Sequence, residues 1–216
     1  MTYTVLGINS LLHLLLSWEN NLRLPPKIID SFGFVPSSLL NLDPLAVPSL
    51  LTSMFLHGDL MHLIGNMLFL LVFGRKVESQ LEAKNYLSFY LASGVTATMT
   101  HTVIQPDSTT PLIGASGAIS GVLGAFLIYN PKARITLIPD PILIYILRRL
   151  TIRVPAWVFI LIWFLLQLHF ATKPGSSTIA FWAHVGGFLM GATMALAIYN
   201  YIPKERFYAA RKRHYD

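Results

Sequence analysis

Apolar residues along the chain fall into long stretches that are separated by shorter, more polar segments. The stretches cover residues 3–18, 61–74, 86–103, 112–129, 154–171 and 179–201. A hydrocarbon core of about 30 Å needs roughly 20 apolar residues in a helix, and each stretch has that length or nearly so. The pattern therefore predicts an all-α membrane protein: one bundle of six transmembrane helices that forms a single domain over residues 1–216.

Lysine and arginine are unevenly distributed between the polar segments. Most of the 16 basic residues follow the second and fourth stretches or lie in the tail, about residues 202–216. Because cytoplasmic loops of membrane proteins carry an excess of lysine and arginine, this bias predicts that both termini are cytoplasmic. The long loop 1, about residues 19–56, then lies on the outer side.

Composition supports lipid as the surroundings of the chain. Hydrophobic residues make up 54% and charged residues only 12%, against about 25% charged in soluble domains. The absence of cysteine excludes a disulfide scaffold and any cysteine-ligated metal site. The net charge of +6 is accounted for by the cytoplasmic clusters, so we expect a lipid bilayer and no nucleic acid as partner. A short chain with no recognisable targeting segment suggests the bacterial cytoplasmic (inner) membrane.

With this topology, three polar clusters lie at the outer ends of helices. His57, His62 and Asn66 lie at the start of the second helix, residues 114–117 at the start of the fourth, and residues 183–187 at the start of the sixth. Polar groups inside a membrane are costly and are usually functional or paired. Since only lysine and arginine were used to assign the topology, the similar depth of the three clusters is an independent indication of a site.

Ser116 is the first candidate for chemistry. Gly114 and Gly117 remove side chains on both sides of it, near a helix N-terminus whose backbone N–H groups have no intrahelical partner. Such groups can stabilise a developing oxyanion. The alternative is that Ser116 is one of the small residues at a helix–helix contact, since Gly117 and Gly121 have the small-xxx-small spacing of membrane helices.

His184 is the candidate base for Ser116. Gly187 and Gly191 lie on its face of the sixth helix and allow close approach to the fourth helix, which brings His184 toward Ser116. The alternative is a buried histidine with a structural hydrogen bond. No acidic residue lies in the helical core, although Asp59 is nearby in a loop, so we predict a Ser–His dyad whose histidine is oriented by packing.

His62 and Asn66 are four residues apart and share one helix face, so both can donate into the space beside Ser116. A metal site is the rival interpretation of the histidines. However, His57 and His62 are five residues apart, no H-E-x-x-H motif occurs, and no carboxylate completes a ligand set. We therefore predict neither a metal nor another cofactor.

Together these motifs resemble the rhomboid family of intramembrane serine proteases. The resemblance rests on His57-x4-His62-x3-Asn66, on Gly114-Ala115-Ser116-Gly117 and on Ala183-His184-x2-Gly187-x3-Gly191. It implies a serine endopeptidase in which Ser116 is the nucleophile and His184 the base. It further implies that His62, Asn66 and the Ser116 amide stabilise the oxyanion, that His57 is supporting, and that the substrates are transmembrane proteins.

The chain departs from the family pattern at one supporting position. Some members carry an aromatic residue four positions after the serine, where it stacks on the histidine, whereas this chain has Ser120. Inactive relatives lose the serine or the histidine, and this chain keeps both. Two alternatives stay open: a catalytically inactive rhomboid-like protein that binds client transmembrane helices, and a channel or transporter.

Overall fold

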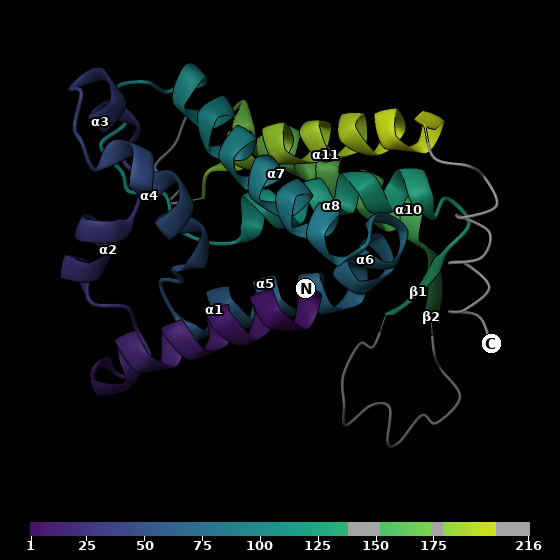
Figure 1. Ribbon diagram of the computed structural model, residues 1–216, viewed down its shortest axis with the longest axis horizontal. Helices are drawn as coiled ribbons and strands as arrows, with labels where there is room; N and C mark the ends of the chain where they lie inside the picture. Colours follow the sequence, from purple (N-terminus) through teal and green to yellow (C-terminus); the bar gives the residue numbers. More distant parts are fainter. Residues whose placement is uncertain (138–151, 174–178, 202–216) are drawn as a thin grey trace.

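The computed structural model describes residues 1–137, 152–173 and 179–201, and most of these residues are helical (Figure 1). The α-helices are α1 (Thr2–Ser17), α2 (Pro26–Phe32), α3 (Pro36–Leu40), α4 (Ala46–Thr52), α5 (Leu60–Phe69), α6 (Arg75–Leu81), α7 (Ala83–Ile104), α8 (Ser116–Tyr129), α10 (Ala156–Ala171) and α11 (Phe181–Tyr201). Short 3-10 turns η1 (Trp18–Asn20) and η2 (Ser53–Phe55) follow α1 and α4, and a π-helical turn, η3 (Leu70–Gly74), joins α5 to α6.

Each of the six apolar stretches contains a helix, which confirms the predicted helical segments. Among the described residues, two continuous helices are long and apolar enough to cross a bilayer, Leu60–Leu81 and Phe181–Tyr201. The helices α8 and α10 are apolar but shorter. The count of six membrane spans and the cytoplasmic position of the termini stay predictions, and the basic tail lies outside the described residues.

The fourth stretch was predicted to be helical from residue 112, but α8 begins only at Ser116. Gly114 adopts a φ of +117°, which only glycine tolerates readily, and its N–H donates to the Ser53 carbonyl at 2.9 Å. Leu112 pairs in an extended conformation with Phe34. This non-helical segment carries the chain into the bundle and delivers Ser116 to the first turn of α8.

The central helix of the bundle is α8, which is buried along nearly its whole length and is surrounded by α7, α11 and η3 (Figure 1). Glycines make this close packing possible. A Cβ on Gly187 would overlap the carbonyl oxygen of Gly117, and a Cβ on Gly191 would overlap that of Gly121. The predicted close approach of the fourth and sixth helices is confirmed.

The loop of residues 19–56 is organised into short helices at one end of the bundle (Figure 1). Pro26 and Pro36 occupy the first turns of α2 and α3, where a missing N–H costs nothing. The loop is tied to the segment before α5 by a hydrogen bond of 2.9 Å from Leu24 N–H to the Gly58 carbonyl. Its last part places Met54 against Gly94 of α7, next to the site.

The all-α prediction did not include an antiparallel strand pair, β1 (Arg134–Leu137) and β2 (Ile152–Pro155). The two strands flank residues 138–151, which are not described. Ile135 pairs with Val154, and such β-branched residues favour extended structure. Each strand has only four residues and resembles the apolar segments around it. Since its pairing partner is distant in the sequence, no local pattern predicted it.

Candidate active site

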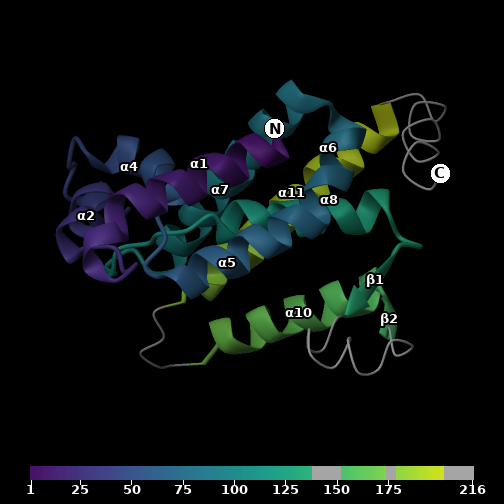
Figure 2. The ribbon, with the colours of Figure 1, turned by 90° about the horizontal axis from the view of Figure 1, so that it is seen from below.

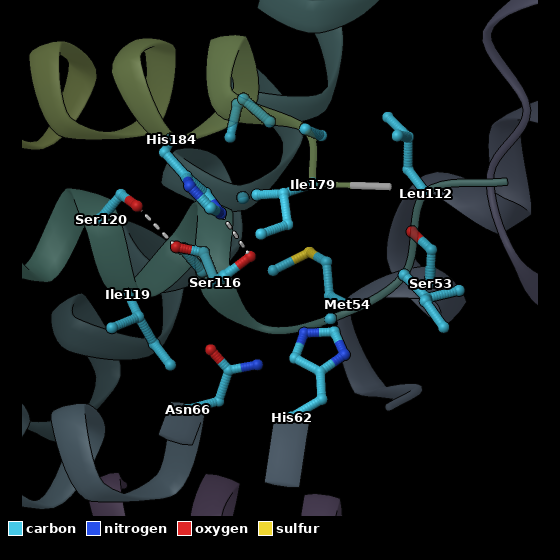
Figure 3. Close-up of a pocket in the computed structure, with 18 of the residues that line it drawn as sticks. Ser53, Met54, His62, Asn66, Leu112, Ser116, Ile119, Ser120, Ile179 and His184 are labelled. Atoms are coloured by element: carbon cyan, nitrogen blue, oxygen red, sulfur yellow. Dashed lines mark hydrogen bonds between the residues drawn. The ribbon is translucent and has the colours of Figure 1, made fainter. Parts of the chain in front are cut away.

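Ser116 is the first residue of α8, and its hydroxyl lies within hydrogen-bond distance of an imidazole. Ser116 Oγ is 2.9 Å from His184 Nε2, although 68 positions separate the two residues (Figure 3). The backbone oxygen of Ser116 accepts a bond of 2.7 Å from the Ser120 hydroxyl. The structure therefore brings together the two side chains on which the sequence argument depends.

His184 lies in the first turn of α11 and is held from two sides. Its Nδ1 is 2.7 Å from Oε1 of Gln167, a residue of α10. The Trp163 ring, also from α10, is centred 6.1 Å from the imidazole, and the Phe181 ring meets it edge-on at 6.3 Å. The sequence predicts that packing rather than a carboxylate orients the histidine, and that prediction does not include the hydrogen bond to this side-chain amide.

Asp59, the acidic residue that the sequence places near the site, caps the helix α5. It is the N-cap of α5, where its Oδ1 accepts a hydrogen bond of 2.8 Å from the His62 N–H. Capping residues of this kind stabilise a helix by about 1 kcal/mol. Asp59 thus fixes the start of the helix that carries His62 and Asn66.

His62 and Asn66 lie on one face of α5 and point into the pocket from the side opposite His184 (Figure 3). Gly114 lies directly against this pair, since a Cβ there would be 2.8 Å from His62 Nε2 and 3.6 Å from Asn66 Nδ2. Asn66 is buried, and its Nδ2 has no hydrogen-bond partner among the residues that the structure describes. An unpaired buried donor is costly, so this amide is available to a ligand.

His57 precedes α5 and is fully buried. Its ring is centred 5.1 Å from that of His62, and its backbone oxygen accepts a hydrogen bond of 3.1 Å from His13 Nδ1 of α1. These contacts place His57 behind His62, away from Ser116. Its position agrees with a supporting role, which stays a prediction.

A cavity of about 720 Å³ connects these groups. Its polar lining includes Ser116, His184, His62 and Asn66, and its apolar lining includes Met54 and Trp163. Gly114 and Gly117 also line it, so the backbone is accessible beside the serine. Within the described parts of the chain, no three His, Asp or Glu side chains are grouped closely enough to hold a metal ion.

Gln167 is the site residue that the sequence argument missed. A signal was present, because α10 is apolar apart from Gln167 and His169, and polar groups in apolar helices are usually paired. Spacing along one helix could not identify the partner, which lies on α11. Trp163 was also missed, since an aromatic residue in an apolar helix is no signal of a functional site.

The fold and the site define a mostly helical protein with a serine–histidine pair that lines a cavity between its helices. Residues 45–201 match the model of the Rhomboid domain family. The chain therefore belongs to the rhomboid family, and it is an integral membrane protein.

Several curated proteins are similar to this chain. Rhomboid protein 1, mitochondrial, from Saccharomyces cerevisiae is 32% identical over 170 residues, which cover 73% of this chain and 44% of that protein. Rhomboid protease GluP from Bacillus subtilis is 42% identical over 78 residues, or 36% of this chain and 15% of that protein. Presenilin-associated rhomboid-like protein A, mitochondrial, from Danio rerio is 31% identical over 99 residues, which cover 45% of this chain and 26% of that protein.

The chain thus matches less than half the length of these relatives. Two of the three are named as mitochondrial and one comes from a bacterium. These relatives do not support the predicted location in a bacterial inner membrane over a mitochondrial membrane. They support an integral membrane protein of the rhomboid family.

Proposed function

We propose that this protein is an intramembrane serine endopeptidase that cleaves transmembrane segments of membrane proteins near their outer ends. The observation that carries the proposal is the 2.9 Å contact between Ser116 Oγ and His184 Nε2 in a cavity walled by helices. A serine hydroxyl is a weak nucleophile until a neighbouring base removes its proton, and imidazole suits that task near neutral pH. We therefore assign Ser116 as the nucleophile and His184 as the general base.

The reaction proceeds through an ester on Ser116. Ser116 Oγ attacks the carbonyl carbon of the scissile peptide bond while His184 Nε2 accepts the hydroxyl proton. When the intermediate collapses, the C–N bond breaks and His184 gives the proton to the leaving nitrogen. Water then attacks the ester with His184 as the base, and Ser116 regains its proton from His184.

The negative charge on the former carbonyl oxygen needs donors, and three surround Ser116. The backbone N–H of Ser116 lies in the first turn of α8, where N–H groups have no intrahelical acceptor. The unpaired Asn66 amide and the His62 ring face the same space, next to Gly114. We assign these groups to oxyanion stabilisation, aided by the positive end of the α8 dipole.

Replacing Asn66 with alanine tests this assignment. Loss of one oxyanion donor is expected to lower kcat by about a hundredfold or more, with little change in KM, because the donor acts on charge that develops only in the transition state. The control is Asn9→Ala, which removes another buried asparagine whose Nδ2 donates within α1. A kcat for Asn66→Ala equal to that of Asn9→Ala would remove Asn66 from the oxyanion site.

The length of α8 supports cleavage below the membrane surface. Its 14 residues rise about 21 Å, which is less than a hydrocarbon core of about 30 Å. Ser116, at the outer end of this short helix, is therefore expected to lie within the bilayer thickness. The cavity around it, with its cluster of polar side chains, supplies surroundings in which water can reach a buried ester.

Substrate chemistry follows from the need to expose a peptide carbonyl. A helix hides its scissile carbonyl in intrahelical hydrogen bonds, so the substrate must unwind locally before Ser116 can attack. Glycine and proline have the lowest helix propensities, so their presence lowers the cost of unwinding. We expect the preferred substrates to be transmembrane helices with such residues near their outer ends.

The proposal is tested with the purified protein in liposomes that also contain a single-span reporter. A reporter with Gly in its outer half is expected to be cut there, as shown by product masses, whereas a matched reporter with Leu in the same positions stays intact. Binding of the reporter without any product would instead favour the inactive, client-binding alternative. Ion flux through the same liposomes would indicate a channel.

A further inference from the structure

The helix α10 lies at the edge of the bundle, where it contacts α11 and α8 (Figure 2). Only two of its residues are fully buried, Ala156 and Ile160. Continuing along the same face at helical spacing leads to Phe164 and then Gln167, both half-buried. Gln167 is thus a polar side chain on the inner face of a helix that is otherwise apolar except for His169.

The contact of Gln167 specifies the protonation of His184. Gln167 Oε1 lies 2.7 Å from Nδ1 of the imidazole, and an amide oxygen can only accept a hydrogen bond. With the amide in this orientation, Nδ1 carries the proton. In a neutral ring this leaves the lone pair on Nε2, which is the atom that faces Ser116 Oγ at 2.9 Å.

We propose that Gln167 is a positioning residue that keeps His184 in the tautomer able to deprotonate Ser116. The proposal rests on the catalytic function proposed above and names the group that takes the place of a triad carboxylate. In the opposite tautomer, Nε2 would carry a hydrogen and could not accept the serine proton. With the Gln167 oxygen toward Nδ1, that tautomer would set two lone pairs against each other, and it would require the amide to turn so that its NH₂ group donates to Nδ1.

A second residue of α10 supports the same ring. Trp163 precedes Gln167 by four residues, so both lie on one helix face, and its ring is tilted by 35° to the imidazole. Ser120 stands where an aromatic residue could otherwise pack on the histidine, and its hydroxyl binds the Ser116 backbone oxygen instead. The side-chain contacts that orient His184 thus come largely from α10 rather than from α8.

The experiment compares Gln167→Leu, which removes the acceptor, with Gln167→Glu, which keeps an oxygen at the same position. Leucine is suited to a lipid-facing helix, so the fold should be retained. The control is Gln80→Leu on α6, which removes a buried glutamine whose Oε1 has no partner in the described part of the chain. Each variant is measured for kcat and KM on the reporter. The His184 tautomer is read from ¹⁵N-histidine NMR spectra, in which the signal is assigned by its loss in His184→Asn.

Gln167→Leu is expected to lower kcat about tenfold with KM unchanged, and to shift part of the His184 population to the Nε2–H tautomer. Gln167→Glu is expected to keep the Nδ1–H tautomer and a kcat within about threefold of the wild type. An unchanged His184 spectrum in Gln167→Leu would overturn the proposal. If the wild type cuts no reporter, the proposed function fails, and the tautomer comparison still decides the role of Gln167.

Discussion

Replacing Ser116 with alanine is expected to abolish reporter cleavage, with a fall in kcat of at least about 10⁴-fold. The variant keeps His184, Asn66 and the cavity but has no oxygen to form the ester. The fold should be unaffected, because the serine side chain is small and half-buried, and among the described residues its hydroxyl is hydrogen-bonded only to the imidazole. The measurement is the initial rate of product formation in liposomes, with reporter binding measured separately.

The control for this variant is Ser79→Ala. Ser79 lies on α6, where its hydroxyl donates to the Lys76 carbonyl at 2.8 Å, so the change deletes the same atom far from the cavity. Ser79→Ala is expected to retain the wild-type rate. Residual cleavage by Ser116→Ala at more than a few per cent of the control rate would show that another group is the nucleophile.

Replacing Gly191 with alanine is expected to have the largest effect on stability. A Cβ at this position would overlap the carbonyl of Gly121, which is backbone and cannot rotate away, so α11 must move off α8. Overpacking of this kind costs about 1–3 kcal/mol. Because His184 lies two turns earlier on α11, we also expect its contact with Ser116 to lengthen and kcat to fall by about a hundredfold.

Gly7→Ala is the matched control for Gly191→Ala. Gly7 lies in α1 with no atom within 4 Å of an added Cβ, so alanine is expected to be neutral or slightly stabilising there. Thermal unfolding in detergent, followed by intrinsic tryptophan fluorescence, compares the two variants. Equal midpoints would show that α8 and α11 do not pack as closely as described.

Much of the helical frame could be predicted because apolar length is a local property of the chain. The helices α1, α7 and α11 fall within a few residues of the apolar stretches that predicted them. The start of α8 could not be predicted in this way. Residues 112 and 113 are apolar, and only the left-handed backbone of Gly114 with its bond to Ser53 separates them from the helix.

In the candidate site too, the residues with a local sequence signal could be predicted and those without one could not. Ser116 and His184 could be paired because the glycines beside them are a sequence signal for close helix packing, and the structure places their reactive atoms 2.9 Å apart. Gln167 could not be connected to His184, since the contact depends on how α10 is rotated against α11. The strand pair that precedes α10 was missed for a similar reason, because strand pairing over a long separation has no local pattern.

The central claim is that the Ser116 hydroxyl is activated by His184, and active-site labelling tests it most directly. A fluorophosphonate reacts with serines whose proton is removed by a neighbouring base. We predict an adduct on Ser116, identified by peptide mass, that is lost in both Ser116→Ala and His184→Asn while the folded protein elutes unchanged from a sizing column. No adduct on Ser116 in the folded wild type, or undiminished labelling in His184→Asn, would contradict the account.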